Sequence, residues 1–173
     1  MTVYRTQFTY ASASTAFTPG ATPQDVFIIE GTTVDNIAVI KMGISTTQTT
    51  DGVNQWNIIK RSTLNTGGTS ALVPIVSYDA QNPGSLTLVQ QYTVNPTAGV
   101  TAHIAWSGWV PSPTITTVGA GNNIVEVDFV DQFGQPMMLT GSTELLAWNF
   151  GGAALPAGLS VLAYVVWYES PKS

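Results

Sequence analysis

The chain contains no cysteine, and its 173 residues include no long hydrophobic run. Without cysteine there can be no disulfide framework, thiolate nucleophile or cysteine metal site, which fits folding in a reducing cytoplasm. No stretch approaches the ~20 apolar residues of a membrane span. The opening residues MTVYRTQFTY also lack the apolar segment of a signal peptide. We therefore expect a soluble chain that is not exported.

Charged residues are also scarce, at 9% of the chain, although hydrophobic residues reach 44%. Soluble domains usually contain about 25% charged residues. The surface must therefore be built largely from neutral polar runs such as STTQTT at Ser45–Thr50. The net charge is −5, and the few cations are Arg5, Lys41, Lys60, Arg61 and Lys172. These cations form no basic stripe for phosphates, which argues against nucleic-acid binding.

Short β-branched and aromatic runs separated by glycine, proline and asparagine recur along the chain, and no long segment has helical periodicity. This pattern predicts an all-β fold in one domain, residues 1–173, with residues 1–12 as an N-terminal arm or an edge strand. We expect an antiparallel β-sandwich, jelly-roll-like, of about eight to ten strands. The expected strands are Asp25–Glu30, Asn36–Ser45, Gln55–Arg61, Leu72–Tyr78, Ser85–Val94, Val100–Val110, Ile124–Val130, Pro136–Thr140, Glu144–Phe150 and Leu159–Glu169, with at most a short one at Thr114–Val118.

Alternation within these strands predicts which side chains enter the core. In Asn36–Ser45 the apolar face is Ala38, Ile40, Met42 and Ile44. In Ser85–Val94 the expected inward residues are Leu86, Leu88, Tyr92 and Val94, with Ser85, Thr87, Gln91 and Thr93 outward. In Leu72–Tyr78, Pro74 indicates an edge position or a bulge, because proline donates no ladder hydrogen bond.

The last strand, Leu159–Glu169, differs because both of its faces are apolar. A strand wetted on one side alternates with polar residues, so this one is expected to be covered twice. We assign Val161, Val165 and Trp167 to the core. We assign Leu162, Tyr164, Val166 and Tyr168 to an oligomer interface, and we add Trp109 as a further interface candidate.

The sequence offers little for catalysis. His103 is the only histidine, and no G-x-S-x-G sequence accompanies it, so we interpret it as partly buried or interfacial. Glu126 and Asp128 share one strand face with Asp131 just beyond, which invites glycosidase or calcium-site hypotheses. A solvated strand face explains the same pattern. We therefore predict no enzyme, no catalytic residue, no cofactor and no metal site.

Aromatic residues are the remaining candidates for binding chemistry, because tryptophan and tyrosine can stack on sugars. Trp106, Trp148 and Phe150 share a phase with aliphatic neighbours, which favours the core. Trp109 and Tyr164 are the residues that we expect at a surface or an interface.

Six stretches of the chain form a recognisable series, namely AFTPGATPQDVFIIEG (Ala16–Gly31), GISTTQTT (Gly43–Thr50), IIKRSTLNTGGTS (Ile58–Ser70), YTVNPTAG (Tyr92–Gly99), VDFVDQFGQPMMLTGSTELLAWNFGG (Val127–Gly152) and a closing strand that ends in WYE. Together they resemble small structural proteins that tailed bacteriophages encode near their capsid genes. The resemblance covers most of the chain in order and is weak at Val73–Gln81 and Thr101–Thr114.

This resemblance implies a jelly-roll protein that trimerises and decorates or cements a capsid shell. The expected partners are further copies of the chain and the major capsid protein, with no nucleic acid and no membrane. The expected location is the capsid surface of the virion, after synthesis in the cytoplasm of a bacterial host. The alternative is a receptor- or carbohydrate-binding module of a fibre or tail tip, which predicts exposed aromatic side chains in a groove.

Overall fold

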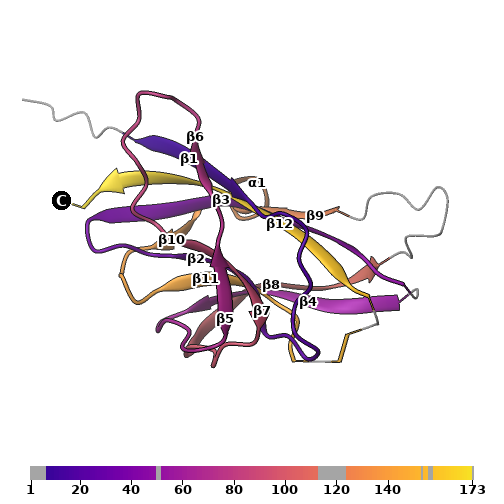
Figure 1. The fold of residues 1–173 in the computed structure, drawn as a ribbon. Coiled ribbons are helices and arrows are strands. Elements are labelled where there is room, and N and C mark those ends of the chain that lie inside the picture. The colour runs from indigo at the N-terminus through magenta and orange to yellow at the C-terminus, as the bar shows by residue number, and fades with distance from the viewer. Residues whose placement is uncertain (1–6, 50–51, 113–123, 153, 156–157, 173) are drawn as a thin grey trace, which may run out of the picture.

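The computed structural model describes residues 7–49, 52–112, 124–152, 154–155 and 158–172, with the backbone alone at 52–53 and 109–112. Twelve strands and one short helix form within these residues (Figure 1). The strands are β1 (Phe8–Ala13), β2 (Asp25–Glu30), β3 (Asp35–Thr47), β4 (Gly52–Arg61), β5 (Thr69–Leu72), β6 (Ile75–Ser77), β7 (Val89–Val94), β8 (Thr101–Ser112), β9 (Ile124–Asp128), β10 (Met137–Leu139), β11 (Leu145–Asn149) and β12 (Ser160–Pro171), and the helix is α1 (Phe129–Phe133).

The strands make two six-stranded antiparallel sheets that lie one above the other (Figure 1). Sheet A has the order β10-β3-β12-β1-β6, with β9 also paired to β3. Sheet B has the order β5-β7-β2-β11-β4-β8. The fold is therefore an all-β sandwich, as the sequence predicts.

Strand pairs are nested along the chain, which defines the topology. β4 pairs with β8, β3 with β9, β2 with β11, and β1 with β12. Successive pairs fall alternately in sheet B and sheet A. A long hairpin rolled up in this way is a jelly roll, so the predicted topology is confirmed. The twelve strands exceed the ten expected ranges because Phe8–Ala13 forms β1 and because the predicted strand Leu72–Tyr78 is divided into β5 and β6, which lie in an insertion between β4 and β8.

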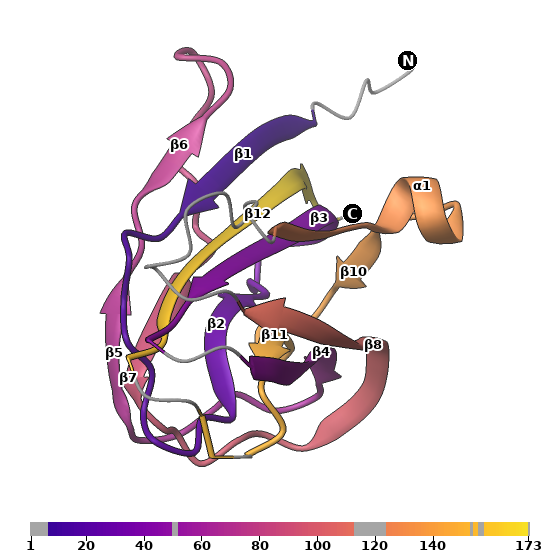
Figure 2. The same ribbon diagram turned by 90° about the vertical axis from the view of Figure 1, so that its right-hand side faces the viewer.

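This insertion, residues 62–100, contains β5, β6 and β7 and runs along one side of the sandwich (Figure 2). β5 is one edge strand of sheet B and β6 is one edge strand of sheet A. The predicted strand Leu72–Tyr78 is broken at Val73 and Pro74, where the chain crosses from one sheet to the other. Pro74 therefore lies between two edge strands and not within one.

β1 corrects the prediction for residues 1–12. It lies between β12 and β6, so it is an inner strand of sheet A rather than an edge strand. β1 also pairs within its own chain, which leaves no swapped arm at Phe8–Ala13. The three-residue strand β6 takes the edge, and nothing local to β1 predicts that pairing. Residues 1–6 lie outside the described residues.

The core between the sheets is rich in large aromatic side chains. Trp56, Trp148 and Trp167 are fully buried, and Trp106 packs against the same cluster from a half-buried position. The rings of Trp56 and Trp148 meet edge to face at 5.9 Å, and Tyr10 stacks on Trp167 at 5.8 Å. Trp148 and Phe150 are both buried in this aromatic cluster, which confirms their predicted place in the core.

A bulge in β3 changes which of its side chains face the core. Val166 of β12 lies opposite Lys41, while the next residue, Trp167, lies opposite Val39, so Ile40 is an extra residue. The core residues are Ile37 and Val39 before the bulge, and Met42 and Ile44 after it. The predicted inward positions of Ala38 and Ile40 are therefore wrong, because one inserted residue reverses the alternation.

The predicted face of Ser85–Val94 is also wrong in its first half. Thr87 and Val89 are buried, whereas Leu86 is 63% and Leu88 is 45% exposed. The backbone of Leu88 accepts a hydrogen bond from Glu30 of β2, and Val89 accepts one from Val73. These bonds place the polar Thr87, rather than the leucines, on the inner side.

Tyr92 and Val94 complete the comparison for that strand. Tyr92 is buried, but it packs with Ile28, Leu145 and Ala147 in a small cluster apart from the main core. Val94 is 53% exposed. In the second half of the strand, the burial of Tyr92 and the exposure of Thr93 are therefore as predicted, whereas the inward position of Val94 is wrong.

The predicted strand Ile124–Val130 ends early. β9 stops at Asp128, and α1 follows over Phe129–Phe133. The side chain of Asp128 accepts hydrogen bonds from the amides of Val130 and Asp131, as a helix N-cap does. Gly134, in the left-handed region with φ 75°, ends the helix. No helix in the described part of the chain is long and apolar enough to cross a membrane.

A buried ion pair connects β2 to β4 in sheet B. Arg61 donates to both carboxylate oxygens of Asp25 at 2.6 Å, and Asn149 of β11 donates to the same carboxylate at 2.7 Å. A third guanidinium nitrogen donates to Gly99 O and to Thr101 Oγ1. The charges are thus removed from water together with their partners, which is the condition for tolerating them there.

Candidate subunit interface

The last strand, β12, separates its side chains as the sequence predicts. Val161, Val165 and Trp167 are fully buried between the sheets, which confirms their place in the core. The alternate residues point to the outer face of sheet A. Leu162 is 47% exposed there, and Tyr164, Val166 and Tyr168 are half-buried. The outer face of sheet A therefore carries a stripe of apolar side chains along its central strand.

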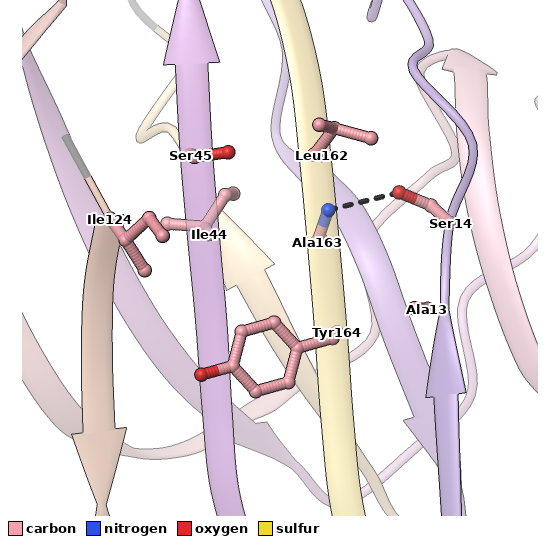
Figure 3. Close-up of a pocket in the computed structure, with 8 residues that line it drawn as sticks. All are labelled: Ala13, Ser14, Ile44, Ser45, Ile124, Leu162, Ala163 and Tyr164. Atoms are coloured by element: carbon pink, nitrogen blue, oxygen red, sulfur yellow. Dashed lines mark hydrogen bonds between the residues drawn. The ribbon is translucent and has the colours of Figure 1, made fainter. Parts of the chain in front are cut away.

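Two adjoining hollows flank this stripe, and they share Ala13 and Tyr164. The larger has a volume of about 420 Å³ and is lined by Ala11, Val76, Tyr78 and Val166 among others. The smaller, of about 260 Å³, is lined by Ile124 and Leu162 among others (Figure 3). We call the two hollows together the trough. It extends across sheet A from β9 to β6, and its lining is mostly apolar.

Small residues make the trough possible. Ala11 and Ala13 are two residues apart on β1, so both face outward, while Ser12 between them is buried and donates to Pro74 O at 2.9 Å. In the smaller hollow, Ser14 Oγ accepts a hydrogen bond from the Ala163 amide at 2.9 Å (Figure 3). Larger residues on β1 would fill the hollow, so its depth follows from the alanines.

The Tyr164 ring lies across β3 toward β9 (Figure 3). It covers Gly43, where an added Cβ would stand 2.1 Å from the ring. Tyr164 is directly opposite Gly43, which in turn is opposite Glu126, and the tyrosine hydroxyl donates to the Glu126 carboxylate. Gly43 therefore provides the space that lets Tyr164 reach two strands away.

The charges beside the trough are paired with one another. Lys41 Nζ lies 3.3 Å from Glu126 and 3.6 Å from Asp128. The hydrogen bond to Glu126 raises the pKa of Lys41. The backbone hydrogen bond from Asp131, and then those from Val130 and Lys41, lower the pKa of Asp128. Lys41 thus lies within ion-pair distance of both carboxylates of its own chain.

Both carboxylates of the predicted pair have contacts within the fold. Glu126 is bound by Lys41 and Tyr164, and Asp128 caps α1. Among the described residues, no group of three or more histidine, cysteine, aspartate or glutamate side chains is placed to hold a metal ion. Asp131 lies on the exposed surface of α1.

His103 lies at a different place, on the exposed edge strand β8 of sheet B. It lines a hollow of about 410 Å³ together with Lys60, Phe129 and Phe133. Ser107, four residues further along β8, donates to Asn57 Oδ1 at 2.6 Å. His103 is exposed, which contradicts the partly buried alternative predicted for it and leaves the interfacial alternative as a prediction. The edge position leaves it without a covering strand.

Trp109 is not part of the predicted interface face. Its backbone pairs with Gln55 in sheet B, whereas the other interface candidates lie on sheet A. Its side chain lies outside the described residues. Alternation within a strand does not indicate to which sheet the strand belongs, so the sequence could not separate Trp109 from the candidates on β12.

The structure thus brings Leu162, Tyr164 and Val166 together around one trough, with Tyr168 further along the same face. It adds residues that the sequence did not single out, namely Ala11, Ala13, Val76, Tyr78 and Ile124. Of the two exposed large aromatics in the described chain, Tyr78 borders this trough. In the sequence, only the two small residues Ala11 and Ala13, which share one face of β1, could have indicated a hollow.

Comparisons with known proteins found no matching family model, no matching curated protein and no matching solved structure.

Proposed function

We propose that this chain is a structural protein of a bacteriophage particle, which assembles into a homo-oligomer and decorates or cements the outer surface of the capsid. Three copies is the number implied by the sequence resemblance. In this proposal the protein catalyses no reaction, and its function lies in the surface that it buries against further copies and the shell.

The observation that carries the proposal is the apolar outer face of sheet A. Ile124, Leu162 and Val76 there are 56%, 47% and 65% exposed. Exposed apolar groups gathered on one face are typical of protein–protein contact surfaces. Burying them yields about 25 cal/mol per Å² before the cost of ordering is subtracted, so several contacts acting together favour a stable assembly.

The chemistry near this face also favours adhesion over catalysis. The two carboxylates nearest the trough are held by Lys41, Tyr164 and the start of α1. A general acid needs a raised pKa, whereas the pKa of Asp128 is lowered. These carboxylates are therefore suited to a structural role, in which they keep β9 and the start of α1 in place beside the trough.

The variant Val166→Asp tests the assembly. Because Val166 is half-buried on the outer face, a carboxylate there can reach water in a monomer but would be buried against a second copy. We expect the native protein to be an oligomer by light scattering at micromolar concentration, and the variant to be a folded monomer. Val165→Asp is the matched control, since Val165 is fully buried and its replacement should unfold the chain.

Co-sedimentation with empty capsids tests the shell contact. The native protein should sediment with capsids, and a glycan array should give no binding. A native protein that is monomeric at these concentrations, or that ignores capsids and binds glycans, contradicts the proposal.

A further inference from the structure

A second apolar surface lies on the insertion, away from β12. Leu86 and Leu88 are 63% and 45% exposed, and Thr87 between them is 2% exposed. Alternation across a buried threonine makes both leucines project from the same side of the chain. Leu72, at 68% exposed, stands beside Leu88 at the edge of the sandwich. We call Leu72, Leu86 and Leu88 the leucine edge.

The shape of the trough determines what can cover it. Its two hollows are recesses in the outer face of sheet A, with alanines on β1 in their lining. Two recesses placed against each other would leave empty space, and voids forfeit the contacts that stabilise an interface. The trough therefore needs apolar side chains that can enter it, and the exposed Leu86 and Leu88 are such side chains.

Charge indicates where those side chains come from. Two copies of a chain with net charge −5 repel each other unless the surfaces that meet are neutral. Residues 80–100 contain no charged residue, and Asp79 is the only one in the whole insertion. At the trough, Lys41 is already paired with Glu126 and Asp128. The insertion therefore brings few charges of its own to a trough whose lining ions, Lys41 and Glu126, are paired within one chain.

We propose that the trough of one copy takes the leucine edge of the next, which makes the contact heterologous. Contacts between two different surfaces form closed rings when the rotation between copies closes, and a three-membered ring is one such assembly. This inference rests on the proposed function for the existence of the oligomer. It adds that each copy uses two separate surfaces, the leucine edge, which lies wholly on the insertion, and the trough, to which the insertion contributes Val76 and Tyr78.

A charge exchange on the full-length chain tests the pairing. Leu88→Lys should raise the dissociation constant of the oligomer by about tenfold or more, as loss of a central contact does. Val166→Asp should do the same from the other side of the contact. The double variant, with both changes in one chain, should recover the oligomer, because every contact then joins the introduced carboxylate of one copy to the introduced ammonium group of the next. The masses are measured by sedimentation velocity, with circular dichroism to verify folding.

Ile104→Lys is the matched control. Ile104 is 58% exposed on β8, outside both surfaces, so its replacement should leave the oligomer unchanged. An oligomer that Val166→Asp dissociates and Leu88→Lys leaves intact would overturn the heterologous contact while retaining the interface on sheet A. A double variant that stays monomeric, although both single variants fold, would also overturn the heterologous contact. A monomeric native protein would instead contradict the oligomer of the proposed function.

Discussion

At the scale of single residues, Gly43 has a role that its position in a strand conceals. Glycine weakens a strand interior, yet here its missing side chain makes room for the Tyr164 ring. The ring then covers the glycine backbone and connects β12 to β9 through Glu126. The residue is thus required by its neighbour and not by its own backbone conformation.

Gly43→Ala should therefore displace Tyr164. In the native background we expect a loss of stability of about 1 kcal/mol, because the ring must swing away and lose its hydrogen bond. In a Tyr164→Ser background the same change should be neutral or slightly stabilising, because alanine suits a strand better than glycine. Urea denaturation of the four chains gives the coupling. Equal effects of Gly43→Ala in both backgrounds would show that the two residues do not interact in this way.

Arg61 is a second residue whose role depends on its partner. It holds the carboxylate of Asp25, which is fully buried. Arg61→Met should cost about 3–5 kcal/mol, since it leaves an uncompensated charge in the interior. The double variant Asp25→Leu, Arg61→Met should cost less than the single one, because no charge is then stranded. Chemical denaturation at neutral pH measures both. A cost below about 1 kcal/mol for the single variant would mean that water reaches Asp25.

At the scale of elements, strand identity follows from the sequence more readily than strand face. β2 occupies the predicted residues Asp25–Glu30, and β12 has its predicted core face. In β3, however, one extra residue at Ile40 reverses the alternation. From Ile37 to Ile40 every residue is apolar, so no polar residue indicates which face of the strand points outward before the bulge.

Two further errors arise from contacts that alternation along a strand does not reveal. Leu86 and Thr87 exchange their expected faces because backbone hydrogen bonds to neighbouring strands decide the orientation. α1 replaces the end of a predicted strand because Asp128 caps it, although Phe129 and Val130 favour a strand. For the candidate interface, alternation along β12 predicts three of the residues at the trough. It cannot predict Val76 or Ile124, which reach that face only through pairing distant in sequence.

The turn between β10 and β11 provides a prediction about pH. Glu144 lies 2.9 Å from Lys60 and accepts hydrogen bonds from the amides of Thr140 and Gly141. Burial alone would raise its pKa, but the hydrogen bonds from Lys60, Thr140 and Gly141 outweigh burial and lower it. A lowered folded-state pKa means that the ionised form stabilises the fold. This stability is present above the unfolded pKa of about 4.3 and is lost as the pH falls through the folded value.

Glu144→Gln should consequently be less stable than the native chain at about pH 7 and closer to it at about pH 3. Thermal unfolding at the two pH values measures the difference. Glu126→Gln is a useful comparison, because Glu126 is more exposed, with 43% of its side chain accessible against 22% for Glu144. A difference between Glu144→Gln and the native chain that stays constant from neutral to acidic pH would contradict the assigned role of the carboxylate.

At the scale of the whole molecule, the low charge content and the apolar outer face have a joint consequence for assembly. Only 9% of the residues are charged, and the ions next to the trough are paired within one chain. Contacts between copies would then depend on apolar burial, which salt does not screen, rather than on ion pairs between copies, which it does.

The proposed oligomer should therefore tolerate salt. Between about 0.05 M and 1 M sodium chloride, the Debye length falls from more than about 10 Å to about 3 Å. Ion pairs between copies would weaken over that range, whereas apolar contacts would keep or slightly increase their strength. Sedimentation equilibrium across the range should show a dissociation constant that changes by less than about threefold. Dissociation at high salt would assign the contact to charged groups such as Lys41 and Glu126, and would require them to pair across copies instead of within one chain.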